Sequence, residues 1–551
     1  MKLFSIIRRY SKLGTVTLAV LFGALSGLAS TGLLLVINRT LFDDKAASEG
    51  RLLMWAFIAL CAVVPLSRIA SGFILVTLGQ RTAYDLRIEL GRRILAAPLK
   101  RLEEVGSHRL MVALTDDIAS VTDALVEVPV IIINLALVIG CLVYLGSLSV
   151  PVLLAVLVFM AIGILSYQIP LVAGMRRQVL VREMADEMFA HFRGLTQGIK
   201  ELKIHGGRRG DFLEHLKRTA GSVRDLGATA RKIFITANTW GSLLFFVVVG
   251  LVLFAVPHLM SIDRMTMSGY VLVLLYLMTP LQLLLNAFPM LTQANIAVRK
   301  VESLGISLLE DGAEVMDSPP AAPAPAWRRL ELRDVALTYR HDDEAHLFRL
   351  GPLDLTFVPG ELVFIVGGNG SGKTTLAKLL LGLYEPEQGD ILLDGEKLTP
   401  ATLERYREHF SVVFSDYFLF EMLLGLQSPA LEADANRYLA QLQLKHKVRV
   451  AGGRLSTTDL SSGQRKRLAL LTAYLEDRPI YLFDEWAADQ DPEFKKVFYD
   501  QLLPELKARG KTVLVISHDD RYYHVGDRIV KLDYGQLEYD QRVNETQYAL
   551  A

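Results

Sequence analysis

One stretch of this sequence reads Leu362-Val-Phe-Ile-Val-Gly-Gly-Asn-Gly-Ser-Gly-Lys-Thr-Thr-Leu-Ala-Lys-Leu-Leu-Leu-Gly-Leu383. Its centre, Gly367 to Thr374, fits the pattern G-x-x-x-x-G-K-[ST]. A short apolar run typical of a buried strand precedes the pattern, and a helical run follows it. Glycines in such a loop let backbone N–H groups curve around phosphate oxygens. The stretch therefore predicts a phosphate-binding loop between a strand and a helix of an α/β domain.

Two side chains of this loop carry specific chemistry. Lys373 is expected to neutralise the β- and γ-phosphates, and Thr374 offers a hydroxyl to Mg²⁺ at a helix N-terminus. We therefore predict ATP and Mg²⁺ as cofactors. The predicted ATP-binding residues of the loop are Gly367, Gly368, Asn369, Gly370, Ser371, Gly372, Lys373, Thr374 and Thr375.

An acidic pair follows a second apolar strand, Ile480 to Phe483. Asp484 is then placed to hold the Mg²⁺ shell, and Glu485 to orient or deprotonate a water molecule. An acidic pair alone is usually a surface feature. The buried strand before it and the phosphate loop upstream favour a catalytic site.

The first half of the chain differs sharply from this domain in composition. Hydrophobic residues make up 51% of the sequence, and most of the apolar excess precedes residue 295 or so. Windows long and apolar enough to span a bilayer are Gly14–Ile37, Leu52–Gly79, Val128–Ser147, Pro151–Leu171, Ile233–Val256 and Ser268–Met290. The spacing Gly23-x-x-x-Gly27 in the first window permits close helix packing. The net charge of +0 argues against a nucleic-acid partner.

Basic residues cluster at the N-terminus and in the long links after the second and fourth windows, including Arg8, Arg92 and Arg208. The positive-inside rule therefore places the N-terminus and both links in the cytoplasm. We predict a six-span α-helical transmembrane domain over residues 1–310 and a Pro/Ala linker over 311–326. The α/β phosphate-loop domain follows over 327–551, also in the cytoplasm.

The segment Leu460-Ser-Ser-Gly-Gln464 lies between the loop and the acidic pair, and in this order the chain resembles the ATP-binding-cassette (ABC) superfamily. The usual signature there is L-S-G-G-Q, from which Ser462 departs. The resemblance implies that Leu460, Ser461, Ser462, Gly463 and Gln464 of one chain face the γ-phosphate held by a second chain. Each chain carries one phosphate loop and one signature, and each ATP must lie between these two motifs on different chains. A homodimer is therefore the simplest assembly.

Further family positions are implied by the same resemblance. Tyr339 matches the aromatic residue that stacks on adenine, although a strand tyrosine can simply pack in a core. His518 matches the histidine that contacts the γ-phosphate, and Asp491 matches the loop that communicates across the nucleotide. The family's metal-shell glutamine aligns with Ser415. We therefore expect Ser415 or the adjacent Asp416 to hold a metal-bound water instead.

The membrane half offers candidates for coupling and for a substrate path. Segments 106–117 and 192–203 resemble the helices with which exporters touch their motor. Gln282, Asn286 and Gln293 recur at helical spacing, so they line a polar path or bond neighbouring helices. Arg68 in the second window is a further candidate for the path, or it lies where that helix leaves the membrane.

A closer resemblance rests on Trp486 after the acidic pair, on Ser415, and on Ile516-Ser-His-Asp-Asp520. These residues resemble the bacterial cyclic-peptide and siderophore-precursor exporters, a group that includes the pyoverdine exporter and lipopeptide and microcin relatives. The resemblance implies ATP-driven export of a peptide-type substrate across the inner membrane by alternating access. A lipid or lipopeptide flippase in contact with membrane lipid is one alternative. A membrane ATPase that regulates or scaffolds a biosynthetic complex is another.

Overall fold

The computed structural model describes residues 13–42, 46–259, 263–307, 326–339, 348–426 and 428–543. The chain divides into two compact units, one formed by Met1–Ile88 with Val112–Glu302 and one formed by Glu89–Met111 with Ser303–Ala551. The expected Pro/Ala linker lies outside the described residues, except for Ala326.

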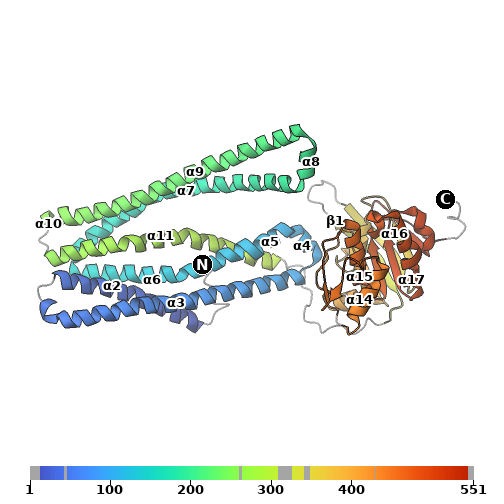
Figure 1. Cartoon of the computed structure of the whole chain (residues 1–551), viewed down its shortest axis with the longest axis horizontal. Helices are drawn as coiled ribbons and strands as arrows, with labels where there is room; N and C mark the ends of the chain where they lie inside the picture. The colour runs from blue at the N-terminus through green and yellow to red at the C-terminus, as the bar shows by residue number, and fades with distance from the viewer. Residues whose placement is uncertain are drawn as a thin grey trace. The chain divides into compact units, whose positions relative to one another are not determined.

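The first unit is built of long helices together with short helical segments that continue or join them (Figure 1). They are α2 (Leu13–Phe42), α3 (Ala46–Ala96), η1 (Ala113–Asp117), α6 (Ile118–Leu148), α7 (Val150–Gln197), α8 (Ile199–Ile204), α9 (Gly206–Gly250), η2 (Leu251–Ala255), α10 (Val256–Leu259) and α11 (Arg264–Ser307). Helices α3 and α11 continue into the second unit. Within the described ranges, six helices are long and apolar enough to cross a membrane, which confirms the predicted spans.

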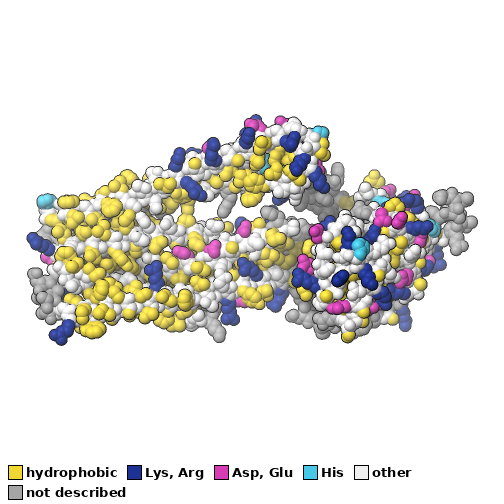
Figure 2. Space-filling view, viewed as in Figure 1, with side chains coloured by type: hydrophobic (Ala, Val, Ile, Leu, Met, Phe, Trp, Pro, Cys, Tyr) yellow, Lys and Arg dark blue, Asp and Glu magenta, His cyan; other side chains and the backbone are white. Residues whose placement is uncertain are grey.

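The surface of this unit is apolar, unlike that of a water-soluble protein, and its interior holds some polar side chains beside an apolar core. Large apolar side chains such as Phe73, Ile169 and Phe254 are about three-quarters exposed, and hydrophobic atoms cover much of the helical surface in Figure 2. Polar side chains lie inside: Asn38 is fully buried and donates a hydrogen bond to Tyr144 Oη at 2.9 Å. Such an arrangement is stable where hydrocarbon surrounds the helices.

Helices α2 and α6 pack at unusually short range because of Gly27. A Cβ atom at this position would lie 2.4 Å from the carbonyl oxygen of Ile133 and 2.7 Å from the backbone nitrogen of Leu137. Only a residue without a side chain allows this approach. The close contact predicted from Gly23-x-x-x-Gly27 is therefore confirmed.

We predict that Gly27→Ala destabilises the membrane unit by about 1–3 kcal/mol, because the added methyl group forces the two backbones apart. The measurement is the thermal unfolding midpoint of the full chain in detergent. Gly72→Ala is the matched control, since nothing lies within 4 Å of a Cβ at that position. Equal midpoints for both variants would contradict the proposed tight contact.

The second unit contains the α/β domain. Its larger sheet has the strand order β12-β11-β3-β10-β9-β6, and a smaller antiparallel sheet has the order β2-β1-β4-β5. The strands are β1 (Leu330–Tyr339), β2 (Phe348–Phe357), β3 (Leu362–Val366), β4 (Gln388–Leu393), β5 (Glu396–Lys397), β6 (Phe410–Val413), β7 (Val450–Ala451), β8 (Arg454–Leu455), β9 (Ile480–Asp484), β10 (Thr512–Ile516), β11 (Arg528–Asp533) and β12 (Gln536–Arg542).

Helices and helical turns complete the second unit, and those from α12 onward lie around the sheets (Figure 1). They are α4 (Leu99–Val105), α5 (Ser107–Val112), α12 (Lys373–Leu380), α13 (Leu403–Arg407), α14 (Leu431–Gln441), α15 (Ser462–Glu476), η3 (Trp486–Asp489), α16 (Pro492–Val497), η4 (Phe498–Leu502), α17 (Leu503–Ala508) and η5 (Asp520–Val525). The predicted class, six spans followed by an α/β phosphate-loop domain, is confirmed.

Strands β3, β6, β9 and β10 pair in parallel, and every residue of β3, β9 and β10 is buried. Such continuous apolar strands are typical of a parallel sheet covered on both faces. Because parallel strands end at one edge, the segments that follow them meet there. This edge carries the candidate site.

Helix α4 belongs to the second unit although its sequence lies between membrane helices. Lys378 Nζ donates to Glu103 Oε1 at 2.7 Å, and the Tyr384 hydroxyl donates to the other oxygen of the same carboxylate. Leu99 packs on the core beneath the smaller sheet. These contacts lie just upstream of segment 106–117, which we predict from the sequence to touch the motor domain.

Candidate functional site

The phosphate loop joins β3 to α12 and depends on glycine at two positions. Gly367 has a φ of 153°, and a Cβ there would lie 2.2 Å from the carbonyl oxygen of Leu532. Gly372 has a φ of 97°, and its Cβ would lie 2.9 Å from Leu350. Side chains are excluded at both positions. The loop therefore presents backbone atoms to a ligand.

Lys373 lies across this loop. Its ammonium group donates to the carbonyl oxygens of Gly367 at 3.1 Å and Gly368 at 2.9 Å. Burial lowers the pKa of Lys373, and the carboxylates of Glu485 and Asp484 oppose that shift. A cation held in a partly desolvated place attracts an anion more strongly than one in water.

The loop also holds an unsatisfied donor. Ser371 Oγ is buried and has no hydrogen-bond partner among the described residues. A buried hydroxyl without a partner is costly, and its place in the phosphate loop gives this one a reason. A phosphate oxygen is a suitable acceptor at this point.

Asp484 is the centre of a group of oxygen ligands at the end of β9. Thr374 Oγ1 lies 3.4 Å from Asp484 Oδ2, and Ser415 Oγ donates to the same oxygen at 3.3 Å. Burial raises the pKa of Asp484, the charge of Glu485 adds to the shift, and the hydroxyls of Ser415 and Thr374 oppose it. One carboxylate with two hydroxyls is a hard-oxygen set that suits Mg²⁺.

Ser415 and Asp416 are the two candidates for the role of the family's metal-shell glutamine, and their contacts differ. Both are exposed, but Ser415 contacts Asp484, whereas Asp416 makes no hydrogen bond to Asp484 within the described residues. The geometry therefore favours Ser415.

Glu485 and His518 meet at the ends of neighbouring strands. His518 Nε2 lies 3.0 Å from Glu485 Oε1. Glu485 adopts a left-handed backbone conformation with φ 47°, and its N–H donates to the carbonyl oxygen of Ile516 at 3.0 Å. Left-handed backbone at a non-glycine residue is often found at functional sites. The carboxylate of Glu485 lies just past the end of β9, within hydrogen-bond distance of His518.

The signature segment begins helix α15. Ser461 is the N-cap residue and forms a capping box with Gln464, which satisfies both backbone N–H groups. Ser461 and Ser462 are exposed. The helix N-terminus, with its positive end of the helix dipole, therefore lies on the surface.

Contacts that the sequence did not reveal connect this helix with the acidic pair. Trp486 is buried and donates from Nε1 to the carbonyl oxygen of Lys466 at 2.8 Å. Arg467 forms an ion pair with Asp491, which also caps α16 by accepting from Phe494 N at 2.8 Å. The signature helix and the predicted communication loop are thus held together within one chain.

Other predicted residues lie elsewhere. Tyr339 ends β1 opposite Phe348, and the structure does not describe its side chain. Gln282 and Asn286 line a pocket in the membrane unit. Gln293 and Arg68 are exposed and do not line that pocket.

Comparison with known families is consistent with this geometry. The family model "ABC transporter transmembrane region" matches residues 13–284, and the model "ABC transporter" matches residues 350–488. The chain belongs to the ABC transporter family. It is a half-transporter, with one membrane domain and one ATP-binding domain, and an ATPase coupled to the movement of substances across a membrane.

Individual relatives cover almost the whole chain. It is 39% identical over 535 residues to the ATP-binding protein SyrD of Pseudomonas syringae pv. syringae, covering 95% of this chain and 93% of the relative. It is 25% identical to an ATP-dependent lipid A-core flippase of Alkalilimnicola ehrlichii, covering 97% and 92%. Its fold is similar to a bacterial Atm1-family ABC exporter with ATP bound, with a TM-score of 0.73, 19% identity, and coverage of 98% and 96%.

We predict that Ser415→Ala raises the Mg²⁺ concentration for half-maximal ATP hydrolysis by about tenfold, since Asp484 loses the hydroxyl that orients it. Asp416→Ala should leave this concentration unchanged. The measurement is a Mg²⁺ titration of ATPase activity in the purified full chain. An unchanged requirement in Ser415→Ala would remove Ser415 from the metal site.

Proposed function

We propose that two copies of this chain form a homodimer that exports a peptide-type substrate, using ATP held between them. The substrate is a cyclic peptide, a lipopeptide or a siderophore precursor, and it leaves the cytoplasm across the bacterial inner membrane. The observation that carries the proposal is the exposed start of α15, with Ser461 and Ser462 at the surface. An exposed helix N-terminus binds phosphate readily.

The phosphate loop supports a site completed by a second chain. Lys373 and Ser371 bind phosphate from one side, and the signature segment of the second copy closes it from the other. Each copy would contribute its phosphate loop to one site and its signature segment to the other, and the Arg467–Asp491 ion pair ties that signature helix to the loop after the acidic pair. Dimerisation therefore explains why one chain carries half of each site.

Glu485 and His518 carry the hydrolytic step in this proposal. Glu485 orients the attacking water and accepts its proton, and His518 positions Glu485 and contacts the γ-phosphate. Thr374, Asp484 and Ser415 would hold Mg²⁺, which neutralises phosphate charge when bound. The switch between dimer states alternates access to the membrane pathway.

Coupling to the membrane domain is proposed to run through α4. Glu103 binds Lys378 and Tyr384 near the end of the phosphate-loop helix. Lys100 adds an ion pair with Glu387 at 3.5 Å. Movement of α12 on nucleotide binding would therefore displace α4, which follows α3 in the chain.

The peptide cargo is supported by the resemblance carried by Trp486 and Ser415. A lipid flippase is the second candidate, because several relatives carry that name, among them the protein from Alkalilimnicola ehrlichii. The two candidates share the motor and differ only in what enters the membrane domain.

Reconstituted vesicles distinguish these functions. A fluorescent cyclic peptide, with or without a lauroyl chain, should accumulate inside vesicles whose motor domains face outward, and only with ATP and Mg²⁺. Lipid scrambling without peptide accumulation would favour the flippase. ATP hydrolysis with neither activity would favour a regulatory membrane ATPase and overturn the proposal.

We predict that Glu485→Gln lowers the ATP turnover number by about 10²–10⁴-fold, because the amide cannot accept the proton of the attacking water. Binding of a fluorescent ATP analogue should persist. Glu493→Gln, an equal charge loss at an exposed position of α16, is the control. Near-normal turnover in Glu485→Gln would exclude Glu485 as the base.

We also predict that Glu103→Ala weakens the α4 contact by about 1 kcal/mol, a modest amount because the carboxylate is one-third exposed. Peptide-stimulated hydrolysis should fall toward the basal rate, while basal hydrolysis stays intact. Glu104→Ala is the matched control, because Glu104 lies on the same helix and pairs with Arg101 of α4 itself. Equal stimulation in both variants would exclude Glu103 from coupling.

A further inference from the structure

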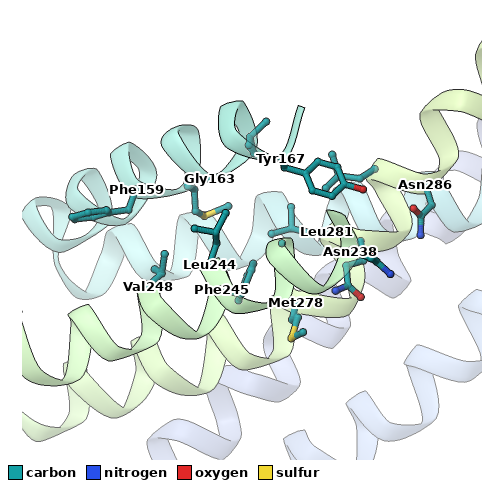
Figure 3. Close-up of a pocket in the computed structure, with 15 residues that line it drawn as sticks. Phe159, Gly163, Tyr167, Asn238, Leu244, Phe245, Val248, Met278, Leu281 and Asn286 are labelled. Carbon is teal, nitrogen blue, oxygen red and sulfur yellow. The ribbon is translucent and has the colours of Figure 1, made fainter. Parts of the chain in front are cut away.

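Helices α7, α9 and α11 enclose a pocket within the membrane unit (Figure 3). The space between its lining atoms amounts to ≈ 780 Å³, a figure that includes the part open to solvent. Gly163 and Gly241 make room in its wall, since a Cβ at these positions would lie 3.8 Å from Leu244 and 3.5 Å from Tyr167.

The pocket changes in polarity along its length. Phe159 and Val248 lie at one end, and Tyr167, Asn238 and Asn286 lie toward the other (Figure 3). The positions of Phe159 and Tyr167 on α7 differ by eight residues, or about 12 Å of helix. The pocket is therefore an apolar slot with amide and hydroxyl groups at one mouth.

Direct bonds near the polar mouth hold the three helices together. Trp240 Nε1 donates to Ser166 Oγ at 3.2 Å and joins α9 to α7. Gln282 Nε2 donates to Ser242 Oγ at 3.2 Å and joins α11 to α9. Gln282 thus has the helix-bonding role that the sequence left open, whereas Asn286 remains at the mouth.

We infer that this pocket binds the acyl chain of an amphipathic cargo whose amide-bearing head lies at Asn238 and Asn286. The inference rests on the proposed function and narrows its substrate class. A wholly polar cargo would bury amides against Phe159 and Phe245 without partners. A wholly apolar one would leave the asparagine amides unsatisfied.

Bilayer phospholipid also carries acyl chains, so the source of the chain must be tested. The asparagine amides offer both donors and acceptors, which match peptide groups. A phospholipid phosphate would instead call for a cation, and neither Lys nor Arg is among the residues that line this pocket. The amide-rich mouth therefore favours the acylated peptide.

Trp240 provides a reporter beside the pocket, since it is followed directly by Gly241 and is 44% exposed. The experiment measures quenching of Trp240 by a cyclic peptide bearing a brominated lauroyl chain, with the full chain in nanodiscs. The same titration on Trp240→Phe isolates the signal of this residue. A second arm places bromine on the nanodisc phospholipid.

Two pairs of variants locate the bound acyl chain of the cargo. Gly163→Leu should fill the apolar slot and weaken binding by roughly tenfold, whereas Gly72→Leu, on α3 with open space around it, should not. Asn286→Leu should weaken binding by roughly fivefold through loss of a hydrogen bond. Gln293→Leu removes an amide from the same helix outside the pocket and should have no effect.

The outcomes separate this inference from the proposed function. Equal quenching in Gly163→Leu and Gly72→Leu would overturn the pocket, and vesicle accumulation of the unacylated peptide would then leave export standing. Quenching by brominated phospholipid that the peptide does not displace would assign the pocket to bilayer lipid and overturn the proposal. A change of oligomeric state in Gly163→Leu, measured by light scattering, would assign it to a second copy.

Discussion

The parallel register of strands β3, β6, β9 and β10 is the constraint on which the nucleotide site depends. Backbone hydrogen bonds between them place the phosphate loop, Ser415, the acidic pair and His518 at one edge of the sheet. No single segment could bring Thr374 and Ser415 within 3.5 Å of Asp484, or His518 within 3.0 Å of Glu485. The buried apolar strands provide the stability that allows Asp484 to remain desolvated and Glu485 to keep a strained backbone.

The membrane unit follows the same physical rules in a different solvent. Hydrocarbon favours apolar side chains on the outside, so packing inside the unit relies on small residues and polar bonds. Gly27 is an example of close packing at a small residue, and Asn38 is an example of a polar bond between helices. The α7–α9–α11 pocket lies where glycines line the wall and hydrogen bonds hold the three helices together. The same features that let the helices associate therefore also leave the pocket between them.

Sequence predicted those parts of the site whose chemistry lies in consecutive residues. The phosphate loop, the acidic pair and the spans belong to this group. Contacts across long sequence separations were not predictable: Glu103 and Lys378 are 275 residues apart, and Trp486 meets the signature helix through tertiary packing. The helix ends were also missed, because α3 continues beyond the predicted Gly79 to Ala96 through a stretch that carries charged residues such as Arg81 and Arg87.

The central claim is that ATP joins the phosphate loop of one chain to the signature segment of another. The most direct measurement is disulfide cross-linking of a Gly370→Cys chain with a Ser461→Cys chain, each carrying Cys61→Ser to remove an exposed native thiol. The account predicts a cross-linked dimer whose yield rises strongly with ATP. A yield independent of ATP, or no cross-link between the two chains, would contradict it.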